Sequence, residues 1–220
     1  MGCQLNRIIR ELFVEEFGEP TLTETIQISE QWKQDAGYGQ ALRRLEALEK
    51  DLEPIGIGWS RYENRTWSFK YPLAYDGMYR QLKYVYLRMR TSSPLRVAAT
   101  RDIVYSSTAH VEACFKVFCR NKGIQGAERK SLSALARSYG TLLEDHLRRV
   151  LGVLGEAVAN PAKHEFDLQG ETSLFGVDDA FAVYLICKKV GYALIMAAGE
   201  ADRLAKACEN GPFLYPTLGV

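Results

Sequence analysis

The strongest constraint on the fold is a helical repeat of apolar residues in the second half of the chain. From residue 104 onward, mostly apolar positions recur at alternating spacings of four and three, so they share one face of an α-helix. These positions are Val104, Thr108, Val111, Phe115 and Phe118. Gly123 and Gly126 follow, and glycine commonly ends a helix. The pattern predicts a long helix from Leu95 to these glycines.

Two more helices are predicted to follow. A second apolar face starts near Ala127 and continues to Val158, a length that leads us to expect a bend at Gly140 or Gly152. A third helix is predicted to run from residues 178–179 to 210–212, with Asp178-Asp179 suiting the helix dipole and Asn210-Gly211-Pro212 ending it.

The first half of the chain has a different character. Apolar and charged residues alternate at helical spacing over 2–17 and over 40–52, which predicts two helices, while residues 21–36 are ambiguous. Aromatic residues alternate over 55–71, which favours a small β-hairpin packed on helices. The alternative is a surface on which nucleic-acid bases stack.

A boundary between two regions is expected where the Tyr- and Arg-rich stretch 75–90 meets Ser92-Ser93-Pro94. We therefore predict an N-terminal α region with a hairpin over 1–94 and a helical domain over 95–220. The overall fold class is mainly α.

Composition excludes several classes of protein. The net charge is +1, so the chain lacks the bulk basic charge of many nucleic-acid-binding proteins, although a local basic patch remains open. No apolar run reaches the length of a transmembrane helix, because Lys188-Lys189 interrupt the longest one. Residues 1–13 carry charges throughout, so no secretory signal peptide is expected. P-loop, GxGxxG, HExxH and GxSxG motifs are absent, so no cofactor is expected.

The cysteines indicate the redox state of the compartment. The five cysteines have no CxxC spacing and are interpreted as packed thiols, which favours a reducing cytoplasm. His110 and Cys114 stand four residues apart, as a metal pair would, but no further ligands have suitable spacing, so no metal site is expected.

The candidate site lies in the stretch from Val158 to Phe166. Asn160, Lys163 and His164 gather at the expected end of the second helix. Pro161 disfavours helical backbone for the residue before it, so a turn or kink is predicted at Asn160. Such a turn would present these polar side chains on a rigid helical base. The alternative for His164 is a helix-end imidazole that bonds a backbone carbonyl.

Residues 95–210 resemble the HEPN domains, which are all-α bundles of prokaryotic toxins, phage-defence proteins and CRISPR-associated ribonucleases. The resemblance rests on the order of the helices, on Tyr105, His110, Glu112 and Lys116 in the first of them, and on the polar motif after the long helix. Many members have Arg, a polar residue, three more residues and then His. Asn160 and His164 fit that spacing, while Ala159 stands where the family has its Arg.

The resemblance implies metal-independent RNA cleavage by a homodimer. A histidine would move protons at the 2′-OH or the leaving oxygen, which suits an imidazole near neutral pH. An arginine would stabilise charge on the phosphorane. In this chain His164 would be the proton-transfer group, Lys163 would be the remaining cation, and Asn160 would be the third site residue.

Ala159 leaves three explanations open. The protein could be a non-catalytic relative, an active enzyme that uses Lys163 and His164, or a variant with an inactivating substitution. Two functions follow: an RNA-cleaving protein of the defence or toxin type, and a non-catalytic adaptor that binds protein or nucleic acid in a larger defence complex. For the adaptor, the stretch 75–90 is the expected contact surface.

Three other groups of side chains are given structural roles. His146 lies between core-facing Leu143 and Leu147 and is interpreted as a partly buried structural residue. Arg148-Arg149 are expected to be solvated, with the alternative that one of them reaches the Asn160 turn. Glu165 and Asp167 are interpreted as loop carboxylates.

Overall fold

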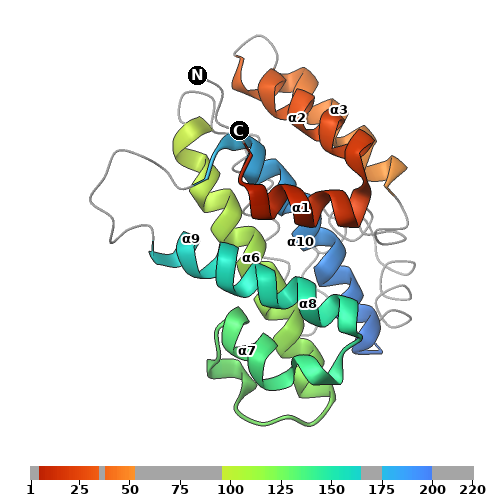
Figure 1. The fold of residues 1–220 in the computed structure, drawn as a ribbon, viewed down its shortest axis with the longest axis vertical. Coiled ribbons are helices and arrows are strands. Elements are labelled where there is room, and N and C mark those ends of the chain that lie inside the picture. The colour runs from red at the N-terminus through yellow and green to blue at the C-terminus, as the bar shows by residue number, and fades with distance from the viewer. Residues whose placement is uncertain (1–4, 35–37, 53–95, 165–174, 200–220) are drawn as a thin grey trace, which may run out of the picture.

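The fold is described by a computed structural model, which places residues 5–34, 38–52, 96–164 and 175–199 (Figure 1). Helices make up 86% of the described residues, and this part of the chain contains no strand. The mainly α class predicted from the sequence is therefore confirmed. The predicted hairpin over 55–71, the basic stretch 75–90 and the boundary near residue 94 lie outside the described residues.

The helices follow one another along the chain in two groups. The first group is α1 (Arg7–Phe17), α2 (Glu19–Lys33) and α3 (Tyr38–Asp51). The second group begins with the long helix α6 (Arg96–Asn121) and ends with the long helix α10 (Val177–Ala197), and the helices between them are short. The short helices are η1 (Ala127–Arg129), α7 (Leu132–Tyr139), η2 (Gly140–Leu142), α8 (Asp145–Val153), η3 (Leu154–Ala159) and α9 (Asn160–His164).

Helix α10 is the centre of the fold. Sixteen of its 21 residues are buried, including side chains on every face of the helix, so other helices must surround it. Figure 1 shows α10 crossing the middle of the molecule beside α6, with α1 to α3 on one side and α7 to α9 on the other. By length and composition α10 could cross a membrane, but 72% of its most apolar window is buried inside the protein, so it is weak evidence for a span.

Helices α6 and α10 approach each other closely at Gly191. A Cβ atom at this position would lie 2.4 Å from His110 Nε2 and 3.2 Å from Cys114 Sγ. His110 is fully buried, and its ring nitrogens lie 3.6 and 3.8 Å from Cys114 Sγ. The absence of a side chain at Gly191 therefore lets α6 and α10 pack at this point, and His110 belongs to the core.

Two carboxylates at the start of α10 attach the N-terminal helices to it. Asp179 accepts hydrogen bonds from the backbone N–H of Asn6 and from that of Gly176, both at 2.8 Å. Asp178 accepts from the hydroxyl of Ser29 in α2 and pairs with Lys33 at 3.3 Å. The acidic start of α10, predicted from helix-dipole considerations, thus also fixes where α1 and α2 lie.

The prediction of a second long helix is wrong. Its apolar face is divided among η1, α7, η2, α8, η3 and α9. One break occurs at Gly140, as expected: η2 starts there, and Leu143 is extended with φ −111° and ψ 163°. Figure 1 shows the result, in which α7 lies below α8 and α9 instead of continuing in line with them. The periodicity is preserved across the break because both parts pack on the same core.

The prediction of a turn at Asn160 is also wrong. Asn160 is helical, with φ −64° and ψ −52°, and α9 continues directly from η3. η3 is a π-helix, in which Asn160 N–H donates to Gly155 O, five residues earlier. The π-helix has already shifted the backbone hydrogen-bonding pattern before Pro161. Pro161, which has no N–H to donate, therefore lies in the first turn of a new helical segment, where proline is tolerated.

Helix α10 ends earlier than predicted. The sequence pattern placed its end at residues 210–212, whereas it stops at Ala197, and Gly199 has a left-handed φ of 74°. Glycine adopts this conformation without the steric cost that other residues incur, which makes it a common helix terminator.

The fold predicts opposite effects for two glycine-to-alanine substitutions. Gly191→Ala adds a methyl group that His110 and Cys114 cannot easily avoid, so we expect a loss of about 1–3 kcal/mol in the free energy of unfolding. Gly152→Ala is the matched control, because nothing lies within 4 Å of its added Cβ, and helical propensity should stabilise it by about 0.5–1 kcal/mol. Urea unfolding followed by circular dichroism measures both; equal effects would contradict the close packing.

The buried cysteines should be unreactive in the folded protein. Burial raises the pKa of the Cys114 and Cys187 thiols, and burial with the nearby Glu128 carboxylate raises that of Cys119 to about 11. Alkylation requires the thiolate, so at about pH 8 iodoacetamide should leave these three thiols unmodified until urea unfolds the chain. Peptide mass spectrometry assigns each site, and rapid native labelling of Cys114 or Cys187 would contradict the described core.

Candidate functional site

Two of the three predicted site residues, Asn160 and Lys163, lie on one face of the segment formed by η3 and α9. Val158 and Ala162 are fully buried and attach this segment to the core. One position later in each case, Ala159 is half-buried and packs against the edge of the core, while Lys163 is exposed. The segment thus presents its polar motif on a helical surface and not on a turn.

A small pocket of about 100 Å³ lies beside this face. Ala159, Asn160 and Lys163 form one wall, residues of α6 form another, and the start of α7 closes it. The remaining lining residues are Tyr105, Thr108, Ala109, Glu112, Ser131 and Leu132. The structure therefore brings two of the three predicted site residues together with Tyr105 and Glu112, two of the four α6 residues noted in the sequence.

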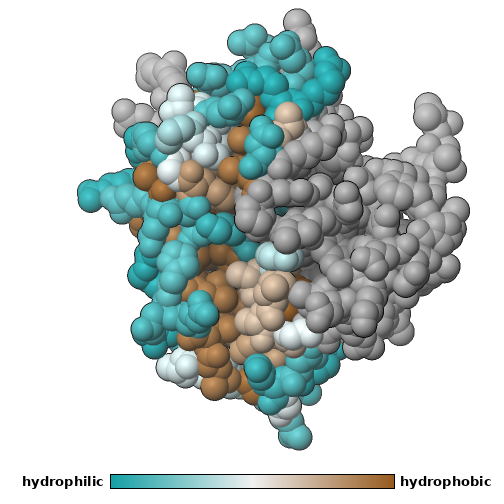
Figure 2. All heavy atoms as spheres, turned by 90° about the vertical axis from the view of Figure 1, so that its right-hand side faces the viewer, coloured by the Kyte–Doolittle hydropathy of each residue, from teal (hydrophilic) through white to brown (hydrophobic). Residues whose placement is uncertain are grey.

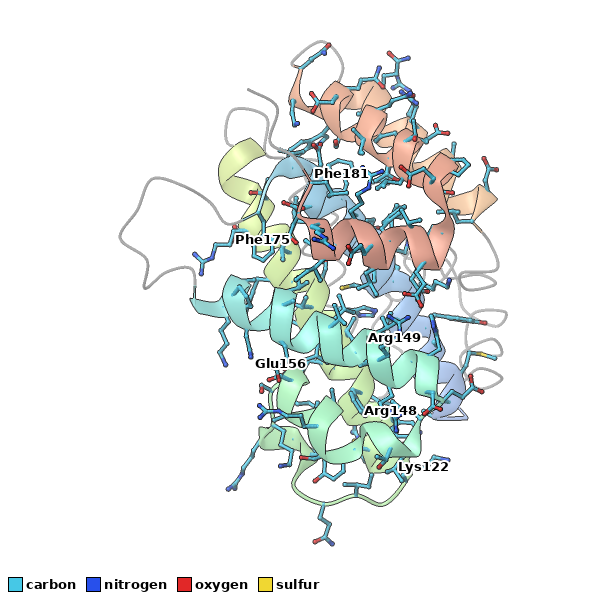
Figure 3. All side chains as sticks on the ribbon, viewed as in Figure 1. Lys122, Arg148, Arg149, Glu156, Phe175 and Phe181 are labelled. Atoms are coloured by element: carbon cyan, nitrogen blue, oxygen red, sulfur yellow. The ribbon has the colours of Figure 1, made fainter. Side chains whose placement is uncertain are left out.

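Asn160 is held by two side chains. Its Oδ1 accepts a hydrogen bond from Ser133 Oγ at 3.4 Å, and its Nδ2 donates to Glu156 Oε2 at 3.3 Å. Glu156 also pairs with Arg137 of α7 at 3.3 Å, and Figure 3 shows its side chain on the α7 side of η3. The amide of Asn160 is therefore fixed in orientation by contacts between η3 and α7.

The close approach of η3 to α7 requires Gly155. A Cβ atom there would lie 2.7 Å from Ser133 Cα and 2.9 Å from Ser133 N, which are backbone atoms that cannot move aside. With glycine at this position, the π-helix lies directly on α7 and Asn160 comes within reach of Ser133. π-Helical turns are frequent at functional sites, which adds weight to this region.

Glu112 organises the opposite wall of the pocket. Its Oε2 accepts from the backbone N–H of Leu132 at 3.0 Å, and its Oε1 pairs with Lys116 Nζ at 2.5 Å. Ser131 caps the same helix, since its hydroxyl accepts from Ala134 N–H at 3.4 Å. The carboxylate charge is thereby balanced, so an anion in the pocket would not meet an uncompensated negative group.

Two cations lie near α9. Arg101 Nε donates to the carbonyl of Ala162 at 3.3 Å, which ties α6 to the last turn of α9. Lys163 has no ion-pair partner within the part of the chain that the structure describes. Lys163 is thus available to a ligand, while Ala159 contributes only a methyl group to the pocket wall.

The third predicted site residue, His164, is the last residue of α9. Its side chain lies outside the described part of the chain, so its role remains a prediction. Among the described residues, no group of three metal-ligating side chains occurs. Glu165 and Asp167 also lie outside the described residues.

The other candidates from the sequence lie away from this pocket. His146 and Arg149 of α8 pair with Glu15 of α1, and Arg148 pairs with Asp145 at 2.8 Å. Figure 3 shows Arg148 and Arg149 at the far end of the α8 to α9 segment, so neither reaches Asn160. Their predicted solvated role is partly right, because both arginine side chains are about half exposed.

Sequence reasoning missed several residues of the site. Ser131 and Ser133 carried a usable signal, because serine just before an apolar helical run is a typical N-cap. Arg101 and Gly155 carried none, since their roles depend on which helices meet.

No protein-family model, no curated protein and no solved structure matches this chain. The function proposed below therefore depends on the residues and their geometry.

The pocket wall can be tested through Glu112. Glu112→Ala would leave the Leu132 N–H and the Lys116 ammonium without their shared acceptor, so we expect unfolding free energy to fall by about 1–3 kcal/mol. Glu112→Gln keeps an acceptor for Leu132 and should cost clearly less. Chemical unfolding of the two variants measures the difference, and an equal loss would show that the backbone contact does not matter.

Proposed function

We propose that this chain is a HEPN-like protein of the prokaryotic defence or toxin type that acts on RNA at the pocket beside α9. The observation that carries the proposal is the pocket itself, in which Ala159, Asn160 and Lys163 lie together with Tyr105 and Glu112 of α6. These residues belong to the two parts of the chain on which the resemblance to HEPN domains rests.

The size and charge of the pocket suit a phosphoryl group. A volume of about 100 Å³ admits a group of that size but not a whole nucleotide, so RNA would lie across the opening. Lys163 offers a free ammonium at the edge, and the amide of Asn160 is already oriented. The ammonium of Lys116, paired with Glu112, offsets the negative charge that would otherwise repel phosphate.

The proposed chemistry divides among three residues. His164 transfers a proton at the 2′-OH or at the leaving oxygen, which needs no metal. Lys163 stabilises the charge of the phosphorane as a point charge, in place of the bidentate guanidinium expected at position 159. Asn160 orients a phosphate oxygen, and a homodimer would bring two such sites together, as in the family.

A second function is favoured by a specific observation. Ala159 supplies no cation, and both ends of the Asn160 amide already have partners in Ser133 and Glu156. A site with satisfied polar groups and a missing cation is suited to binding a partner without reaction. In this alternative the chain is a non-catalytic adaptor that binds protein or nucleic acid in a defence complex.

Restoring the missing cation separates the two functions. Ala159→Arg places a guanidinium at the pocket wall beside Lys163, so we expect RNA cleavage to rise by about 10²-fold or more over the parent chain. Cleavage of labelled RNA, followed on denaturing gels with and without EDTA, is the measurement. The activity should resist EDTA because no metal takes part.

Two controls accompany this test. Ala159→Gln has a long neutral side chain and should give no gain, which separates charge from bulk. Ala159→Arg combined with His164→Ala should return to the background rate. Cleavage that survives His164→Ala would show that the site is assigned wrongly. If Ala159→Arg does not cleave and a protein partner co-purifies with the parent chain, the adaptor function is supported instead.

A further inference from the structure

The segment that connects α6 to α7 is strongly basic, although the whole chain has a net charge of only +1. Over residues 120–130 it carries four cations and a single carboxylate, Glu128. The cations are Arg120, Lys122, Arg129 and Lys130. We call residues 120–130 the basic connection. Figure 1 shows it at the lower end of the molecule next to α7, and Figure 2 shows hydrophilic side chains at the tip of that end.

The cations of the basic connection are open to solvent and available. Arg120, Lys122 and Arg129 are exposed, while Lys130 is half-buried over the ring of Tyr139. Figure 3 shows Lys122 at the lower end of the molecule. None of the four cations has an ion-pair partner within the described part of the chain. The surface therefore has positive charge that other side chains do not offset.

Other exposed arginines of the second half of the chain differ in this respect. Arg137 pairs with a carboxylate of η3, Arg148 pairs with one in its own helix, and Arg149 pairs with one in α1. Their charges are used between helices, whereas those of the basic connection are not. An uncompensated cluster of cations attracts anions from solution.

The backbone of the basic connection is fixed without help from these side chains. At the end of α6, Gly123 N–H donates to Arg120 O and Ile124 N–H donates to Cys119 O, both at 2.9 Å. These bonds form the usual closing motif of a helix that ends in glycine. Nothing lies within 4 Å of a Cβ atom added at Gly123. The cations thus stand on an ordered turn that a ligand can approach closely.

The basic connection leads directly to the α9 pocket. Lys130 immediately precedes Ser131, which lines that pocket. On α6, Arg120 follows Glu112, another residue of the pocket wall, by two helical turns, which is a distance of about 12 Å. Lys163 stands on the opposite wall. A polymer with a negative charge on every unit can therefore place one charge in the pocket and further charges on the connection.

The side chains between the cations favour a nucleic acid over a lipid surface. Gln125 is exposed, and Ile124, the large aliphatic residue of the connection, is half-buried. Protein segments that lie in a membrane surface insert exposed apolar side chains beside their cations, and residues 120–130 expose no large apolar side chain. Cations with exposed amide side chains suit a phosphate backbone.

We propose that the basic connection binds the phosphate backbone of RNA and leads the strand to the α9 pocket. The choice of RNA as the polyanion rests on the function proposed for that pocket. Arg120 and Arg129 contact phosphates outside the pocket and take no part in the reaction. The connection thus supplies affinity, which the small pocket by itself provides only weakly.

The test measures how salt weakens binding to the full chain. The probe is a labelled oligouridine strand with 2′-O-methyl groups, which has the charge of RNA but cannot be cleaved by attack of its 2′ oxygen. Fluorescence anisotropy gives the affinity between about 50 and 200 mM salt. Each phosphate contact contributes about 0.7 to the slope of log affinity against log salt concentration, because it releases bound counterions.

Two variants assign the contacts. Arg120→Gln and Arg129→Gln should each reduce the slope by about 0.7 and weaken binding at 0.1 M salt by about fivefold. Both side chains are exposed and without ion-pair partners in the described chain, so the variants should fold as the parent does. Arg7→Gln is the matched control, because it removes the same charge from an exposed residue of α1 and should leave the slope unchanged.

The outcomes separate this proposal from the function of the pocket. If Lys163→Gln weakens binding while Arg120→Gln and Arg129→Gln do not, the pocket function stands and the basic connection is overturned. If the two arginine variants reduce the slope while Lys163→Gln has no effect, the connection is supported and the pocket is not the RNA site.

Two further results would overturn the proposal. An equal loss in Arg7→Gln would show that net charge and not the basic connection attracts the strand. Phosphatidylserine vesicles are the second probe. Binding of the chain to these vesicles without binding to oligouridine would identify a membrane as the partner.

Discussion

The architecture depends on the burial of α10. A helix with buried side chains on every face cannot be covered by one neighbour, so α6, α1, α2 and α8 all pack against it. At Gly191, which has no side chain, the His110 imidazole of α6 occupies the space that a Cβ atom would need. The acidic start of α10 then attaches α1 and α2 through backbone and side-chain hydrogen bonds. The remaining helices form an outer layer, in which α3 packs on α2, and α7 and α9 pack on η3 and α6.

The second half of the chain covers α10 and α6 with short helices, and this division creates both cavities. The break around Gly140 to Glu144 turns the chain between α7 and α8 and leaves Leu142 exposed at the edge of a larger cavity, of about 610 Å³, between the ends of α6, α8 and α10. The π-helix η3 then leads into α9, where Lys163 is exposed and Ala159 is half-buried, while Val158 and Ala162 are fully buried. Each cavity lies beside a departure from regular α-helix, which is where packing between regular surfaces is interrupted.

The two cavities differ in the groups that they leave available. At the α9 pocket the carboxylate of Glu112 has its partners, and the free group is the ammonium of Lys163, so the pocket suits an anion. At the larger cavity between the ends of α6, α8 and α10, the buried carboxylate of Glu16 faces Lys189 with one oxygen and His146 with the other.

The sequence by itself determined the helical class, the end of α1, the span of α6, the acidic start of α10 and the grouping of Asn160 with Lys163. These features depend on local periodicity, on charge near a helix end and on residues close in the chain. Only the tertiary structure decided that the second predicted helix breaks, that Pro161 continues a helix, and that Glu16 meets His146 and Lys189. Those outcomes depend on contacts between distant segments, such as Gly155 against Ser133, which local pattern does not contain.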